Sequence, residues 1–296
     1  MIIERKIRED IRRIITEELH ISDDVKYMSR DISAKIAASM RNTSPERISR
    51  GVSRKYGRVE TKLGKGKIKV SYEVYQFGDK ETMDTFIIEK GGGNQFSVRV
   101  NNNLSLMNVF LCCTGGQMSK QDVSELSDTI YHETSHLYQQ EKMGDRYKFN
   151  NDYRTALALI DSPNTVKHKV ALVLYLSNKS EQVAFANGLY GFLKQMFFDE
   201  NADIDPKCYK QSAMYKILKE CVETRQFLLG NKTIVCQELT ESGYSISYQR
   251  LLKMCEETIN ELERKIGRVL VKFFSDKHEN GEISVTDTND FYDVFI

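Results

Sequence analysis

The sequence lacks the features of membrane-spanning, disulfide-rich and cysteine-ligated metal proteins. Its longest apolar run, Val170 to Leu176, is far too short to cross a bilayer. The first residues, Met1 to Lys6, become charged at once and contain no signal-peptide core. Six cysteines in 296 residues do not form a disulfide framework, and the chain has no CxxC pair. We therefore expect a cytoplasmic protein without a membrane span and without a cysteine-based zinc site.

Proline and histidine are also scarce, with three and five residues respectively. Few prolines permit long helices, because proline interrupts the helical hydrogen bonds. An apolar content of 40% and a charged content of 29% are those of an ordinary globular protein. The chain is long enough for one large domain or two modest ones.

The charge is unevenly distributed along the chain. Residues 1–70 carry 18 Lys or Arg against 10 Asp or Glu, whereas the whole chain has a net charge of only +1. A basic N-terminal region is suited to contact nucleic acid, a membrane surface or an acidic partner protein. The alternative interpretation is a solvated helical face without a partner.

One short motif stands out, His-Glu-x-x-His at residues 132–136. Ser119 followed by Asp122 is typical of a helix start, and Gly144 is typical of a helix end. Between these signals apolar residues recur at helical spacing, with no proline or glycine. The sequence therefore predicts one helix across the motif.

On such a helix, His132 and His136 lie one turn apart on the same face. Two neutral imidazoles at this spacing can bind one Zn²⁺, and Glu133 can reach a water on the metal as the general base. The alternative is an amphipathic helix whose two histidines lie at the surface or at the edge of the core.

The segment before the motif has the period-two alternation of strands. A hairpin is expected from residues 59–63 and 68–74 around Gly64-Lys65-Gly66, and a second one from 85–88 and 96–100. A further apolar strand, 108–113, leads into the motif helix. Elsewhere the patterns predict helices at 3–20, 22–40, 165–176, 180–198, 207–229 and 246–274.

A catalytic zinc ion needs three protein ligands and an open position for water. Glu181 is the candidate for the third ligand, because Ala184 and Gly188 follow it at i+3 and i+7 and would permit close approach of another helix. The alternative is that Asn178 caps this helix and Glu181 is only the acid of a capping box.

His-Glu-x-x-His followed by a helical Glu181-x-x-Ala184 resembles the gluzincin metallopeptidases, over roughly residues 105–195. It does not resemble the metzincins, because Gln139 and Lys142 replace their Gly and His. The resemblance implies zinc bound by His132, His136 and Glu181, with Glu133 as general base. Many gluzincins carry an Asp four residues after the glutamate ligand. This chain has Phe185 there, so support for a histidine would come from elsewhere, for example from Asp128.

From these observations we expect an α+β, zincin-like fold, with a small, mostly antiparallel sheet packed on the motif helix and extensive helical parts at both ends. Three regions are predicted: basic helices in 1–50, a metal-binding core in 51–203, and a helical region with an acidic tail in 204–296.

The resemblance implies a zinc metallopeptidase that acts on peptides or proteins. Two alternatives stay open: a zincin-like structural or binding protein that contacts a partner through its basic N-terminal helices, and a zinc amide hydrolase of small molecules. His168, Tyr153 and Tyr190 are candidates for stabilising the oxyanion, and the sequence does not rank them.

Overall fold

The computed structural model describes residues 22–41, 53–63, 66–77, 99–101, 104–112, 120–143, 151–197 and 206–279. The chain divides into two compact units, one comprising 22–147 with 194–198 and the other comprising the remaining residues. The three regions predicted from the sequence, with divisions at residues 50 and 203, stay a prediction. None of the described helices is long and apolar enough to cross a membrane.

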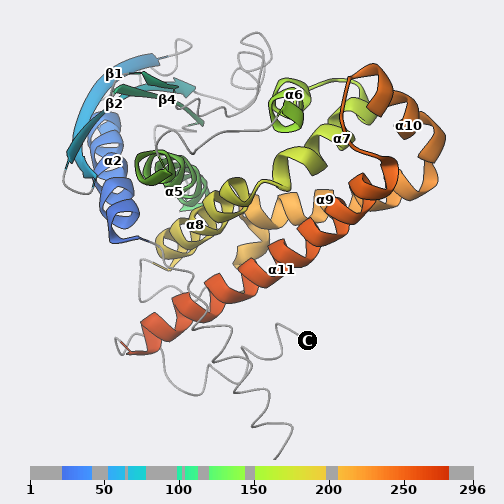
Figure 1. Cartoon of the computed structure of the whole chain (residues 1–296). Helices are drawn as coiled ribbons and strands as arrows, with labels where there is room; N and C mark the ends of the chain where they lie inside the picture. Colours follow the sequence, from blue (N-terminus) through green and yellow to red (C-terminus); the bar gives the residue numbers. More distant parts are fainter. Residues whose placement is uncertain are drawn as a thin grey trace, which may run out of the picture. The chain divides into compact units, whose positions relative to one another are not determined.

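The described part of the first unit contains the motif helix, a second helix and four strands. Figure 1 shows α2 beside the strands. Helix α2 contacts both strand β1 and helix α5. The strand order in the sheet is β1-β2-β4-β3. The elements are α2 (Asp23–Arg41), β1 (Ser53–Leu63), β2 (Gly66–Phe77), β3 (Arg99–Asn101), β4 (Leu104–Cys112) and α5 (Lys120–Met143).

The prediction of an α+β fold with a small, mostly antiparallel sheet packed on the motif helix is wrong. Every residue whose side chain the structure describes lies in a helix or in a connection beside one, and none of these residues lies in a strand. The backbone of the sheet also departs from expectation, because its central pairing, β2 with β4, is parallel. Alternation of apolar and polar residues indicates strands, but it does not determine which strands pair or in which direction.

Several local predictions for this unit are nevertheless confirmed. Helix α5 begins at Lys120 and ends at Met143, between the start and stop signals in the sequence. Helix α2 covers the segment predicted after Ser22. Strands β1 and β2 pair antiparallel, with Leu63 opposite Gly66, as the first hairpin requires. The predicted helix at 3–20, the capping residue Ser119 and most of the second hairpin lie outside the described residues.

The second unit is helical throughout its described part. Its central helix is α7, which is buried from Val170 to Leu174 and contacts α6, α9, α10 and α11. Helices α6 and α10 were not predicted, whereas α7 has the predicted bounds. The elements are α6 (Asn151–Leu159), α7 (Thr165–Leu176), α8 (Lys179–Met196, of which residues up to Leu193 belong here), η3 (Pro206–Gln211), α9 (Ala213–Gly230), α10 (Lys232–Glu241) and α11 (Tyr248–Glu279).

Helix α11 owes its length and position to an apolar stripe. Its buried side chains recur every three or four residues, which places them on one face of an α-helix. This face packs chiefly on α9 and also on α7. The buried residues of the stripe include Leu251, Cys255, Leu262, Ile266, Val269 and Phe273.

A buried hydroxyl pair joins α2 to the motif helix in the first unit. Ser29 Oγ and Thr134 Oγ1 lie 2.5 Å apart, and both side chains are fully buried. Thr134 Oγ1 also donates to the backbone carbonyl of Ile130 at 2.7 Å. Thr134 stands inside the His-Glu-x-x-His motif, so this pair fixes the face of α5 that lies against α2.

We expect Ser29→Ala to lower the free energy of unfolding by about 1 kcal/mol, because one buried hydrogen bond is lost. Ser33 on the same helix is the matched control, since its buried Oγ has no hydrogen-bond partner among the described residues. Ser33→Ala should therefore be neutral or slightly stabilising. Urea denaturation of both variants measures the difference. Equal losses in the two variants would contradict this role for the Ser29–Thr134 contact.

Candidate metal centre

Helix α5 brings the two histidines of the motif together. The Nε2 atoms of His132 and His136 lie 3.1 Å apart, and the rings meet edge-on with centroids 4.8 Å apart. His132 is buried and His136 is half-buried. The i,i+4 spacing on a continuous helix produces this convergence, as the sequence predicts.

The separation of the two nitrogens fits a shared metal ion. Zinc binds histidine nitrogen at about 2.0–2.1 Å with tetrahedral angles, which places two such nitrogens about 3.3 Å apart. The distance of 3.1 Å in this structure is close to that value.

Glu181 is the buried acidic residue in the first turn of α8, with a side chain only 2% exposed. Tyr153 on α6 donates a hydrogen bond to its Oε1 at 2.6 Å, and Tyr175 on α7 donates to its Oε2 at 2.5 Å. The two tyrosine rings are stacked, with centroids 5.8 Å apart. Two hydroxyls from two other helices therefore fix the orientation of this carboxylate.

The alternative of a capping box is only partly met. Asn178 does lie at the start of α8, where its Oδ1 accepts a hydrogen bond from the backbone N–H of Ser180 at 2.9 Å. The carboxylate of Glu181 has instead the two tyrosine hydroxyls as partners. Capping of the helix start does not require it.

His132, His136 and Glu181 form the group that could hold a metal ion. One ligand atom from each lies within 4.8 Å of the others. Two imidazole nitrogens and one carboxylate oxygen are ligands of borderline divalent metals and leave a fourth position open. Glu133, next to His132, is half-buried and is not a member of this group.

Two further residues named from the sequence are buried, and each lies four residues from a proposed ligand in the sequence. Asp128 is 2% exposed and lies one turn before His132 on α5. Its role in supporting a histidine stays a prediction. Phe185, which replaces the aspartate of many gluzincins, is buried on α8. An apolar ring at this position cannot accept a hydrogen bond from an imidazole.

The three oxyanion candidates lie in different surroundings. Tyr153 contacts Glu181 directly, whereas Tyr190 packs its ring edge-on against Phe273 of α11. His168 contacts the carbonyl of Ile160 through Nδ1 and the carboxylate of Glu220, on α9, through Nε2 at 2.7 Å. Both ring nitrogens of His168 are thus engaged in contacts that hold α7 in the helical unit.

Tyr175 is the residue of this site that the sequence did not reveal. It precedes Glu181 by six residues and lies on a different helix, with a turn at Ser177 and Asn178 between them. No helical periodicity spans such a break. Tyr153 was named from the sequence, but its helix, α6, was not predicted, because the segment after Gly144 is polar.

The described cysteines do not belong to the ligand group. Cys208, Cys221, Cys236 and Cys255 form no disulfide among the described residues. Burial raises the pKa of Cys221 to about 12 and that of Cys255 to about 11, so both remain protonated at neutral pH. Because zinc binds the thiolate, these two are poor ligands.

Comparison of the chain with models of protein families, with curated proteins and with solved structures gives no match.

The two tyrosines that bond Glu181 should affect metal affinity. We expect Tyr153→Phe and Tyr175→Phe each to weaken zinc binding by about 10-fold or more, because partners that orient a ligand typically contribute 10- to 100-fold. Competition with a chelator measures the dissociation constant.

Tyr244→Phe is the matched control for these variants. The Tyr244 hydroxyl is buried without a hydrogen-bond partner among the described residues. Burial is also the main cause that raises its pKa to about 12. Its loss should leave zinc affinity unchanged. Unaltered affinity in the Tyr153→Phe, Tyr175→Phe double variant would show that the tyrosines do not position a ligand.

Proposed function

We propose that this protein is a zinc-dependent metallopeptidase of the gluzincin type. The observation that supports the proposal most strongly is the convergence of ligand atoms from His132, His136 and Glu181, with Glu133 beside the first of them. The two histidines come from one turn of a helix and the glutamate from a separate helix. This arrangement is the one that the resemblance to gluzincins implies.

Zinc is the proposed metal because of the chemistry of the donors. Imidazole suits zinc, copper, iron and nickel, whereas magnesium and calcium prefer sites made of oxygen. Two histidines with one glutamate are a common ligand set of catalytic zinc. Three protein ligands leave one position for water or substrate, which a structural zinc site would fill with a fourth side chain.

When bound, zinc would polarise the scissile carbonyl and lower the pKa of a water molecule toward neutrality. We assign the proton transfers to Glu133. It lies about 100° around the helix from His132, and its half-buried side chain is accessible from solvent. As general base it would take a proton from the attacking water and then pass it to the leaving amine.

Tyr153 and Tyr175 would hold the third ligand, Glu181, in a fixed orientation. Their hydroxyls hold both oxygens of Glu181, so the carboxylate does not rotate freely. A fixed carboxylate reduces the entropy that metal binding would otherwise cost. Tyr153 has a single O–H and donates it to Glu181, so it could stabilise an oxyanion only after releasing that hydrogen bond.

Glu133→Gln separates catalysis from metal binding. The amide cannot act as a base but has nearly the same shape, so the variant should retain one zinc per chain. Hydrolysis should fall by about 100-fold or more, which is the typical contribution of a general base. Metal analysis together with cleavage of a casein or peptide mixture measures both quantities. Full activity in the variant would refute the mechanism, and bound zinc without activity in the wild type would favour a binding protein.

Glu181→Ala tests the third ligand. We expect zinc binding to weaken by several orders of magnitude if Glu181 is a ligand, since an open site with two histidines holds zinc poorly. His168→Ala is the control, because both ring nitrogens of His168 contact Ile160 and Glu220 and neither is a proposed zinc ligand. Its zinc content should be unchanged. Loss of zinc in His168→Ala with retention in Glu181→Ala would exclude the gluzincin assignment.

A further inference from the structure

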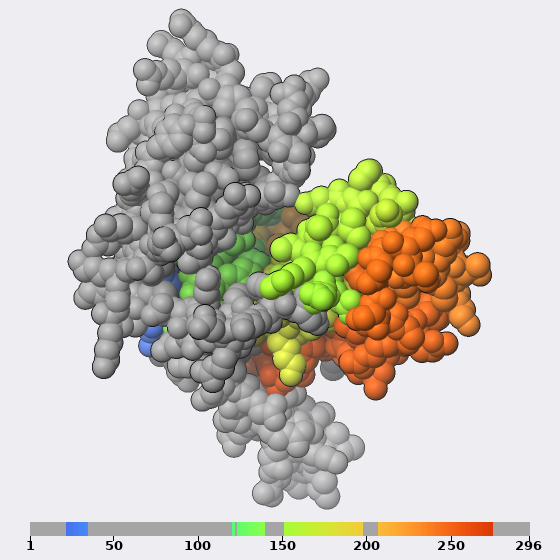
Figure 2. All heavy atoms as spheres, turned by 45° about the horizontal axis from the view of Figure 1, so that its top comes forward, coloured from blue at the N-terminus to red at the C-terminus, as the bar shows by residue number. Residues whose placement is uncertain are grey.

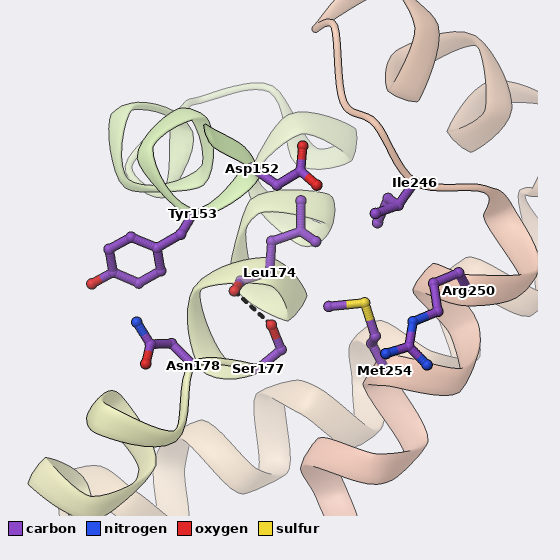
Figure 3. Close-up of a pocket in the computed structure, with 8 residues that line it drawn as sticks. All are labelled: Asp152, Tyr153, Leu174, Ser177, Asn178, Ile246, Arg250 and Met254. Atoms are coloured by element: carbon purple, nitrogen blue, oxygen red, sulfur yellow. Dashed lines mark hydrogen bonds between the residues drawn. The ribbon is translucent and has the colours of Figure 1, made fainter. Parts of the chain in front are cut away.

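The helical unit contains a pocket of about 420 Å³. Figure 3 shows that its lining comes from α6, from the end of α7 and the turn that follows, and from α11 with the segment before it. On the face seen in Figure 2, the segment around α6 lies beside the C-terminal helices. Hydrogen bonds from Ser245 to Asp152 join the same two segments.

Three apolar side chains line the pocket beside its polar ones. Leu174, Ile246 and Met254 point toward one another across it (Figure 3). Ile246 follows the turn after α10, in which Gly243 has a φ of +70° and reverses the chain in a conformation that other residues rarely adopt. These walls suit the methylene groups of a ligand.

The two charged residues of the lining, Asp152 and Arg250, differ in their contacts with other residues of the protein. Both oxygens of Asp152 accept hydrogen bonds from Ser245, one from its backbone N–H at 3.1 Å and one from its hydroxyl at 2.8 Å. Arg250 has one acidic neighbour at a much longer distance, Glu257 at 4.0 Å. A guanidinium has five N–H donors, so Arg250 retains donors for a ligand on the pocket side.

Tyr153 connects this pocket with the proposed metal ligand. Tyr153 is among the residues that line the pocket, and its hydroxyl donates to Glu181.

We propose that the pocket binds an acidic side chain of the peptide substrate, with Arg250 as the partner of its carboxylate and the apolar walls around its methylene groups. This inference rests on the proposed function and adds the substrate class. The carboxylate of Asp152 repels a doubly charged ligand more strongly than a singly charged one. The pocket is therefore better suited to one carboxylate than to a phosphate group.

The test uses three peptides, acetyl-Ala-Ala-X-Ala-Ala-amide with Glu, Gln or Lys as X. Binding to the full chain that carries Glu133→Gln is followed by NMR titration, so that cleavage does not interfere. We expect the Glu peptide to bind about fivefold more tightly than the Gln peptide, as for a partly exposed ion pair. Arg250→Gln should abolish this preference.

Lys253→Gln is the matched control. Lys253 lies on the same helix and also faces Glu257, at 3.6 Å, but it is not among the pocket residues. The preference for Glu should persist in this variant. Equal affinities, a preference for Lys, no binding, or a preference that survives Arg250→Gln would each overturn the proposal. Failure of the proposed function would appear separately, as absence of zinc or of hydrolysis, because peptide binding requires neither.

Discussion

The candidate site depends on a single geometric constraint, the one-turn separation of His132 and His136 on a continuous helix. Imidazoles four residues apart converge only while the backbone between them stays helical. Two residues between the histidines are anchored within this helix. Thr134 and Ser135 are fully buried, and their hydroxyls bond backbone carbonyls of the preceding turn at Ile130 and Tyr131.

A second constraint is the burial of a carboxylate. Removing an ionised group from water costs several kcal/mol unless hydrogen bonds or charges replace the solvent. Tyr153 and Tyr175 supply two such hydrogen bonds to Glu181. A buried acid with an oriented carboxylate is expensive to maintain in a purely structural role, where an apolar residue would pack as well. This cost is a reason to assign Glu181 a chemical role.

How far the sequence predicts this structure depends on the range of each signal. Start and stop residues with helical periodicity predicted α5 and α7 well, because both signals are local. The prediction of the fold class was wrong. Strand alternation does not show that β2 and β4 pair in parallel, and it does not show that the described side chains belong to helices. The motif pointed to the two histidines and the small residues after Glu181 pointed to that carboxylate; the three form a group that could hold a metal ion, and their role as ligands stays a prediction. Tyr175 was missed because its contact with Glu181 depends on how α7 and α8 turn at Ser177.

The most direct test of the central claim is X-ray absorption at the zinc edge of the protein loaded with one equivalent of zinc. The account predicts a four-coordinate zinc with only nitrogen and oxygen ligands at about 2.0–2.1 Å and with the multiple-scattering signature of two imidazoles. A sulfur shell at about 2.3 Å, a single imidazole, or no specifically bound zinc would contradict it.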